Sequence, residues 1–259
     1  MINVLGIVQA RCSSSRLPGK VLKPILGQAM ILRQLERLGR VNGIDRLVLA
    51  TSDDPSDDEL ARVVEGAGVP VFRGELDNVL ARFHHAALRF GPCRHVARMT
   101  GDCPVTDAGV IDEVIRVHLA HDNDYTTNAQ VPSYPHGMDV EVMTWAGLEE
   151  SFANAELPSE KEHVTLYLKN HPEKFRLENI RHEPDWSHYR VTVDEPEDFE
   201  VVSRIYEALY ERNPAFDMLD IVRLLDAHPA LREINSGMDR HAGLNKSLAQ
   251  DAAYLDGRE

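Results

Sequence analysis

The sequence predicts an α/β fold of three layers, in which helices cover both faces of a mostly parallel, Rossmann-like sheet. Through the first half of the chain, short apolar runs rich in β-branched residues alternate with longer segments of helical periodicity. This alternation is typical of βαβ units, whose right-handed crossovers place the strands in parallel. Ligands bind such sheets beyond the carboxyl ends of the strands, so the loops that follow strands are the candidate site.

The first half of the chain contains four expected strands and four expected helices. Its opening run NVLGIVQ is apolar and short, as a buried strand is, whereas Ile31, Leu35 and Leu38 recur at helical spacing. The acidic turn Thr51–Pro55 can cap the helix that follows it. These patterns predict strands at Asn3–Gln9, Arg46–Ala50, Val69–Phe72 and His95–Met99, and helices at Met30–Val41, Asp57–Gly66, Asn78–Phe90 and Ala108–His121.

After Asp124 the alternation becomes less regular. A proline-containing segment, Gln130–Gly137, separates two expected strands, and we expect a small β arm over Gln130–Thr144. From Ile234 onward the pattern is mixed and is typical of a docked tail. We expect strands at Asp124–Thr127, Met138–Thr144, Phe175–Ile180 and Tyr189–Val193, and helices at Ala146–Asn154, Ser159–Asn170, Pro196–Tyr210 and Met218–Ala227.

Composition indicates a globular protein with one main domain. The 259 residues are 43% hydrophobic and 27% charged, which is enough for a sizeable core. We expect a domain over residues 1–215 and a helical extension over residues 216–259 that packs on it. No apolar run reaches the ~20 residues of a membrane span. Three cysteines without a C-x-x-C pair, and no basic leader before the apolar start, favour a reduced, cytoplasmic location.

The charge distribution points to a local anion site. The net charge of −14 disfavours nucleic acid as a partner, yet residues 1–40 carry seven basic side chains and one acidic one. Three of the seven, Arg11, Arg16 and Lys20, lie in the loop after the first strand together with serines. Fixed cations and backbone amides of this kind can bind a triphosphate, although a solvated polar turn has the same composition. The loop is not a Walker A motif, because Val21 follows Gly19-Lys20.

Two aspartates are candidate metal ligands. Asp102 follows an expected strand and Asp194 ends another, so both carboxylates belong to the ligand edge of the sheet. Mg²⁺ prefers one or two carboxylates plus phosphate oxygens and water. Taken alone, Asp102 can equally make a turn, and Asp194 can equally cap the next helix. Asp139 and Glu141 lie two apart on an expected strand and therefore point to one face.

The loop is similar to the signature of the cytidylyltransferases that activate acidic sugars, the deoxy-octulosonate and sialic acid CMP-transferases. The similarity covers roughly residues 1–210 and is strongest to the spore-coat polysaccharide, SpsF-like branch. Gln9, where the sugar-acid enzymes often carry proline, also suits that branch. The matching segments, in order, are A-R-x-x-S-S-R-L-P-G-K at residues 10–20, Ala50–Ser52, Arg98–Pro104, His136–Val142, Glu160–Thr165 and Arg190–Asp198.

The resemblance implies a nucleotide-diphospho-sugar transferase type of fold and a set of site residues. Arg11, Lys20 and Asp102 are the implied catalytic residues, and Asp102 and Asp194 the implied Mg²⁺ ligands. Nucleotide binding is implied for Ala10, Arg11, Ser14, Ser15, Arg16, Lys20, Thr51, Ser52, Arg98, Thr100, Gly101 and Asp102. Acceptor binding is implied for His136, Gly137, Asp139, Glu141, Glu162, His163 and Arg190.

The resemblance further implies an enzyme that transfers CMP from CTP to a small acidic sugar, with release of pyrophosphate, for cell-surface polysaccharide. A homodimer is implied, and residues 130–144 are the candidate contact. Three alternatives stay open: a nucleotidyltransferase for another base or acceptor, a glycosyltransferase that consumes a nucleotide sugar, and a non-catalytic nucleotide-binding module. The glycosyltransferase alternative is disfavoured, because Asp102 is followed by Cys103-Pro104 and so does not begin the D-x-D pattern that is typical of that class.

Overall fold

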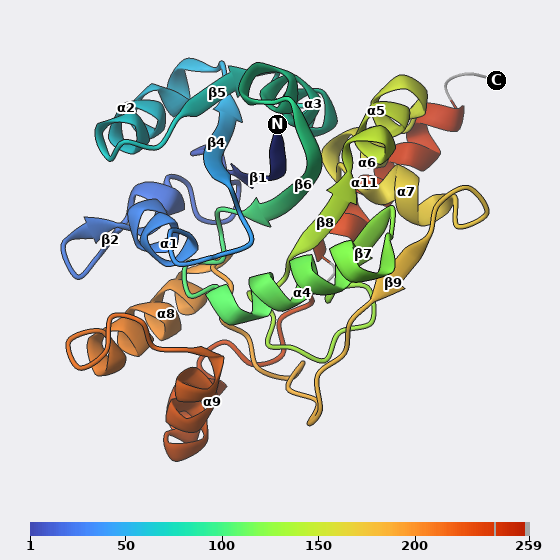
Figure 1. Cartoon of the computed structure of the whole chain (residues 1–259). Helices are drawn as coiled ribbons and strands as arrows, with labels where there is room; N and C mark the ends of the chain where they lie inside the picture. The colour runs from blue at the N-terminus through green and yellow to red at the C-terminus, as the bar shows by residue number, and fades with distance from the viewer. Residues whose placement is uncertain (241, 257–259) are drawn as a thin grey trace.

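In the computed structural model, which describes residues 1–240 and 242–256, a seven-stranded sheet runs through the centre of the molecule (Figure 1). The strand order is β5-β4-β1-β6-β8-β7-β9, and β8 runs antiparallel to its neighbours β6 and β7 while the other pairs are parallel. The predicted mostly parallel sheet is therefore confirmed. Its strands are β1 (Ile2–Gln9), β4 (Arg46–Ser52), β5 (Val71–Gly74), β6 (Cys93–Thr100), β7 (Tyr125–Thr127), β8 (Glu141–Thr144) and β9 (Leu177–Asn179).

Helices cover both faces of this sheet and complete three layers. Buried side chains of β1 alternate: Val4 and Val8 pack into one apolar cluster, and Leu5 and Ile7 into the other. The first cluster takes side chains from α1 (Met30–Leu38), α2 (Asp58–Gly66), α4 (Ala108–His121), α8 (Pro196–Leu209) and α9 (Met218–Ala227). The second takes them from α3 (Val79–Phe90), α5 (Trp145–Asn154) and α7 (Leu166–Asn170).

The structure divides one predicted helix in two. The expected helix Ser159–Asn170 is wrong, because α6 (Pro158–Glu162) ends before α7 begins and Val164 between them has a φ of 52°. Val164 is fully buried, and the neighbouring Thr165 hydroxyl donates to Glu141 at 2.6 Å. Tertiary contacts thus override the local helical pattern at this turn.

The segment expected as a strand at Tyr189–Val193 also differs. It is extended, but its pairing is a single bridge between Arg190 and His136, and its next hydrogen bond runs from Val193 N to Asp102 O at 2.7 Å. Residues 130–144 do not project as an arm: Tyr134, Met138 and Val140 are buried and β8 joins the central sheet. A separate two-stranded sheet forms instead from β2 (Pro24–Ile25) and β3 (Gln28–Ala29), which extends from the body in Figure 1.

Beyond residue 215 the described residues contain three helices and the turns between them. These helices are α9, α10 (Pro229–Glu233) and α11 (Ala242–Asp256), and Figure 1 shows α11 beside α6, far in sequence from it. Asp251 of α11 accepts hydrogen bonds from the Ser159 amide at 2.9 Å and hydroxyl at 2.5 Å. The division at residue 215 stays a prediction. Among the described residues, no helix combines the length and apolarity that crossing a membrane requires.

Candidate active site

Three loops meet at the carboxyl ends of β1, β4 and β6. The Gly101 amide donates to Gln9 O at 2.7 Å, and the Ala10 amide donates to Ala50 O at 3.3 Å. A Cβ atom on Gly101 would lie 2.6 Å from the Ala10 Cβ, so only glycine allows this close approach of the two loops. The edge predicted from the alternating pattern thus places the first loop against the Gly101–Pro104 turn.

A cavity of about 480 Å³ opens between these loops. It brings together most of the residues that the sequence assigns to nucleotide binding, although they come from distant parts of the chain. The helical end of the first loop, the short 3₁₀ turn Lys20–Leu22, supplies Lys20. Predicted residues that line this cavity are Ala10, Arg11, Ser14, Ser15, Arg16, Lys20, Thr100, Gly101, Asp102, Glu162 and Asp194.

Two arginines in this cavity form no ion pair with an acidic side chain in the part of the chain that the structure describes. Arg11 forms no hydrogen bond or ion pair with any other described residue, and it acts on Arg82 as a neighbouring like charge. Arg82 is 2% exposed, and no described residue offers its Nε a hydrogen bond. Burial, followed by the charge of Arg11, lowers the pKa of Arg82 to about 10. Two such cations that face one cavity form a site for an anion.

The sequence did not predict Arg82 as a site residue, because an arginine inside a helix is usually exposed to solvent. Its place on α3 is fixed by the Asn78 side chain, which caps the helix by accepting from the Ala81 amide at 3.0 Å. The available signal was the position of Arg82 between Ala81 and Phe83, which are both buried.

Lys20 connects the two predicted metal ligands. Its Nζ lies 2.9 Å from Asp194 Oδ1 and 3.8 Å from Asp102 Oδ2, and it also donates to Val193 O at 2.6 Å. Burial is the largest single influence on Asp102 and opposes its charge, but the Lys20 ammonium and the hydrogen bonds from Thr100 and Cys103 together lower the pKa of that carboxyl. Both carboxylates thus lie within 4 Å of the same ammonium group.

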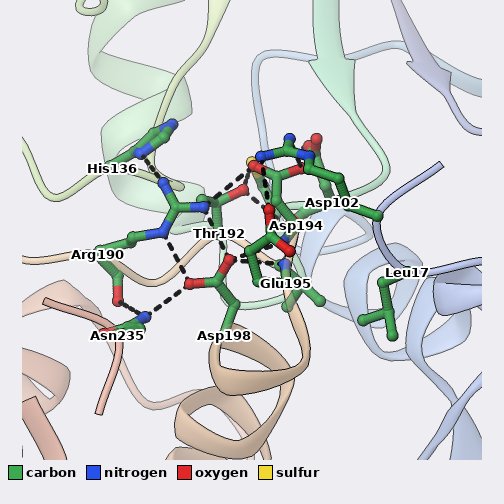
Figure 2. A network of polar contacts seen from close by, with 12 residues as sticks. Leu17, Asp102, His136, Arg190, Thr192, Asp194, Glu195, Asp198 and Asn235 are labelled. Atoms are coloured by element: carbon green, nitrogen blue, oxygen red, sulfur yellow. Dashed lines mark hydrogen bonds and ion pairs between the residues drawn. The ribbon is translucent and has the colours of Figure 1, made fainter. Parts of the chain in front are cut away.

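Asp194 is held by three cations. Besides Lys20, Arg16 Nη2 lies 3.1 Å and Arg190 Nη2 3.2 Å from its carboxylate oxygens. Figure 2 shows Arg190 pointing toward His136, Asp194 and Asp198, with Asn235 closing the network from the C-terminal segment. The cap position of α8 is Glu195, so the Asp194 carboxylate faces the cavity and not the helix.

A second cavity, of about 290 Å³, adjoins the first. The two share a wall formed by Arg16, Thr100, Asp102, Asp194, Ala242 and Gly243. The residues that the sequence assigns to the acceptor and that line this second cavity are His136, Asp139, Glu141 and His163. The metal candidates thus lie at the boundary between the two predicted substrates.

Glu141 is the best-satisfied acid of the second cavity. Its carboxylate pairs with Arg98, lies 3.3 Å from Lys169 Nζ, and accepts from the hydroxyls of Tyr125 at 2.5 Å and Thr165 at 2.6 Å. Burial opposes its charge, but Lys169 and Arg98 hold its pKa well below its usual range. Arg98, expected at the nucleotide, therefore lies in the second cavity.

Several predicted residues support the site without lining the expected cavity. Thr51 and Ser52 are fully buried, and the Ser52 amide donates to Asp57 at 3.2 Å. Gly137, with a φ of 113°, allows the close approach of Val191 and Thr192, and it lines neither cavity as the described residues form them. Arg190 likewise lines neither cavity as the described residues form them, and its guanidinium forms an ion pair with the Asp194 carboxylate.

The histidines of the predicted acceptor site are largely buried. Burial, then the charges of Arg240 and Arg190, lowers the pKa of His136 to about 3. Burial also lowers the pKa of His163, whose Nε2 lies 3.0 Å from Ser247 Oγ of α11. Glu162 accepts from the same hydroxyl at 2.5 Å and faces the first cavity. Both histidines are therefore neutral near pH 7.

The carboxylates present fit a hard divalent cation. Asp102 and Asp194 converge on Lys20, and within the described ranges no group of three or more His, Cys, Asp or Glu side chains gathers as a metal cage. Mg²⁺ takes two carboxylates when substrate phosphates and water supply its other oxygens. The donor set therefore matches an ion that binds together with a phosphate ligand.

Comparison with known proteins finds a matching family profile, similar sequences and similar structures. A profile described as cytidylyltransferase matches residues 5–218. The spore coat polysaccharide biosynthesis protein SpsF of Bacillus subtilis is 34% identical over 238 residues, which are 88% of this chain and 96% of that protein. A cytidylyltransferase structure from Leptospira borgpetersenii superposes with a TM-score of 0.86 at 29% identity, over 92% of this chain and all of that one. CMP:2-keto-3-deoxy-manno-octonic acid synthetase in complex with CTP shares the fold, with a TM-score of 0.62 at 17% identity, over 79% of this chain and 98% of that one.

Proposed function

Because this chain belongs to the cytidylyltransferase family, we propose that it transfers CMP from CTP to an acidic sugar, with release of pyrophosphate and dependence on Mg²⁺. One observation carries the proposal. Lys20 contacts Asp194 and Asp102 at the wall that two adjoining cavities share. Four cationic side chains line the first cavity, Arg11, Arg16, Lys20 and Arg82, and suit a triphosphate, while the second cavity suits a sugar acid.

The reaction is a direct displacement. The hydroxyl of an acceptor in the second cavity attacks the α-phosphorus of CTP in the first, and the bond to pyrophosphate breaks. Arg11, Arg16 and Lys20 orient the phosphates and neutralise the charge that develops on the leaving group. Asp102 and Asp194 would hold Mg²⁺, which supplies charge neutralisation at the phosphate oxygens when bound.

The acceptor side is supported by the second cavity and by the relatives. Arg98, Lys169 and Arg240 line that cavity together with Asp139 and Glu141, so it offers both cations for an acid group and carboxylates for hydroxyls. The names of SpsF and of the octonic acid synthetase refer to polysaccharide formation and to a sugar acid. We therefore propose a role in cell-surface polysaccharide synthesis, in the cytoplasm, as a homodimer.

The proposal is tested by pyrophosphate release. Purified protein is incubated with CTP, UTP, GTP or ATP, with a panel of ulosonic and nonulosonic acids, and with Mg²⁺ or EDTA. We expect release with CTP and at least one acid, and loss of release in EDTA. Release with UTP or GTP in preference to CTP would refute the base assignment, and release that is independent of any acid would refute the acceptor class.

A further inference from the structure

The C-terminal segment returns to the site from beyond the part of the chain that the cytidylyltransferase profile matches. The cytidylyltransferase profile ends at residue 218, yet Arg240, Ala242, Gly243 and Leu244 line the second cavity. Asn235 anchors the start of the segment, because its Nδ2 donates to Arg190 O at 3.1 Å and to Asp198 Oδ1 at 2.8 Å. A wall of the acceptor cavity therefore comes from the tail.

Polar contacts fix this wall against α6. Ser247 donates to Glu162 at 2.5 Å and lies 3.0 Å from His163 Nε2, and further along α11 Asp251 is bonded to Ser159. Asp251, Ser159 and Ser247 are all buried. Buried polar groups that satisfy one another define a single docked position, so the tail presents its cavity-facing residues at fixed places.

Arg240 is the cation that this wall places in the second cavity. Its side chain is 16% exposed, and Nη2 donates to Asp139 Oδ1 at 2.5 Å. Nη1 is buried and has no hydrogen-bond partner among residues 1–240 and 242–256. A buried guanidinium nitrogen without an acceptor is unfavourable, and an anionic ligand would satisfy it.

The other cations of the cavity are more fully engaged. Arg98 and Lys169 both bind Glu141, whose carboxylate also takes two hydroxyl donors. Arg16 binds both Asp194 and Glu195 at 3.1 Å. Arg240 has one carboxylate partner and one unfilled nitrogen, so it can accept a second anion with the least rearrangement.

We propose that Arg240 binds the anionic group of the acceptor, so that the C-terminal segment selects the acceptor while the first loop selects the nucleotide. This inference rests on the function proposed above. Arg240 and Asp139 then act as a pair: the guanidinium takes the acid group of the sugar, and the carboxylate is available to its hydroxyls.

The test compares acid and neutral acceptors in the Arg240→Ala variant. The acceptor is an acid that the wild-type enzyme uses, and its methyl ester is the neutral counterpart. KM is measured for CTP, acid and ester by pyrophosphate release. The matched control is Arg223→Ala, since Arg223 is an arginine of α9 that is 74% exposed and pairs with Asp220.

Losing a charge-assisted contact should raise KM for the acid by about 10- to 100-fold. KM for CTP should stay unchanged, and acid and ester should become equivalent in Arg240→Ala but not in the control. If Arg240→Ala does not fold, Arg240→Lys decides the matter: KM should rise for the acid and not for the ester. The inference is overturned if Arg240→Ala keeps the wild-type ratio of KM for the acid to KM for the ester. It is also overturned if that ratio is lost in Lys169→Ala and not in Arg240→Ala. Absence of release by the wild type with every acid overturns the proposed function itself, and the inference with it.

Discussion

Replacement of Lys20 by methionine tests the centre of the site. Lys20 is 8% exposed, and its ammonium bonds Val193 O at 2.6 Å and Asp194 Oδ1 at 2.9 Å. Methionine keeps most of the side-chain volume but removes both hydrogen bonds and the charge. The carbonyl loses a partner worth about 1 kcal/mol and the carboxylate one worth about 1.5–3 kcal/mol. Because Arg16 and Arg190 still bind Asp194, the free energy of unfolding should fall by only about 3 kcal/mol in total.

This loss should appear as a lower melting temperature. For a chain of this size ~3 kcal/mol corresponds to a decrease of about 6–12 °C, measured by circular dichroism in EDTA at pH 7. Asp102 adds a pH dependence, because Lys20 lowers its pKa in the folded state. That contribution is present above the unfolded pKa and is lost as the pH falls through the folded one. The difference between wild type and Lys20→Met should therefore shrink in acid.

Activity provides the second measurement. Loss of one preorganised charge contact lowers the rate by about 10²–10³-fold, so pyrophosphate release by Lys20→Met should fall by that factor. Lys23→Met is the control, since Lys23 Nζ lies 5.1 Å from the Phe199 ring centre, outside the cavity. A cation–π contact near the surface is worth only about 0.5–1 kcal/mol. Equal melting temperatures for the two variants, or full activity of Lys20→Met, would refute the assignment.

Three further changes probe neighbouring parts of the fold. Asp102→Ala should reduce pyrophosphate release by ~10²-fold or more at saturating Mg²⁺, and wild-type turnover would exclude it as a metal ligand. Glu141→Gln should destabilise the protein by about 3–5 kcal/mol at pH 7, because it leaves Arg98 and Lys169 without their carboxylate. Glu141 has a lowered pKa, so this difference in urea unfolding should shrink as the pH falls below ~4.3; a constant difference contradicts the ion-pair account. Asp251→Ala should release α11 and speed proteolysis within it, as Ser159 loses both of its bonds to that carboxylate, whereas cleavage as slow as in the exposed Asp256→Ala variant would argue against docking through Asp251.

Local signals predicted much of the fold. Helices α4 and α9 begin and end where expected, and both start after an aspartate, Asp107 and Asp217, whose carboxylate accepts from the helix amides. The β1 strand differs from its expected start by one residue. Capping residues and apolar periodicity act over a few residues, so the sequence reveals them directly.

Features that depend on distant partners were not predictable. The extended segment that carries Asp194 has a strand-like composition, but the structure gives it a bridge to His136 and a bond to Asp102 O in place of a sheet neighbour. The interruption at Val164 reflects burial of that residue. Both follow from how elements pack, which no local pattern contains.

The candidate site also contains residues that local sequence signals reveal and residues that only packing brings into place. The first loop and the turn at Asp102 were found because cations, serines and an acid follow strands. Arg82, Lys169 and Arg240 were missed because they come from helices and a tail whose sequence gives no sign of a cavity. Their contribution depends on where α3, α7 and the C-terminal segment pack.

The pairing within the site predicts that CTP and Mg²⁺ bind as a unit. In the chain alone, Lys20 and Arg16 are bound to Asp194, and a triphosphate that draws these cations away leaves that carboxylate with Arg190. The freed oxygen then suits a divalent ion, which in turn needs the phosphate oxygens. Calorimetric titration of CTP should therefore show affinity at least about 5-fold higher with Mg²⁺ than in EDTA, and Mg²⁺ affinity should rise by the same factor with CTP. In Asp194→Asn this coupling should weaken; full coupling in that variant would show that the exchange of partners at Asp194 does not occur.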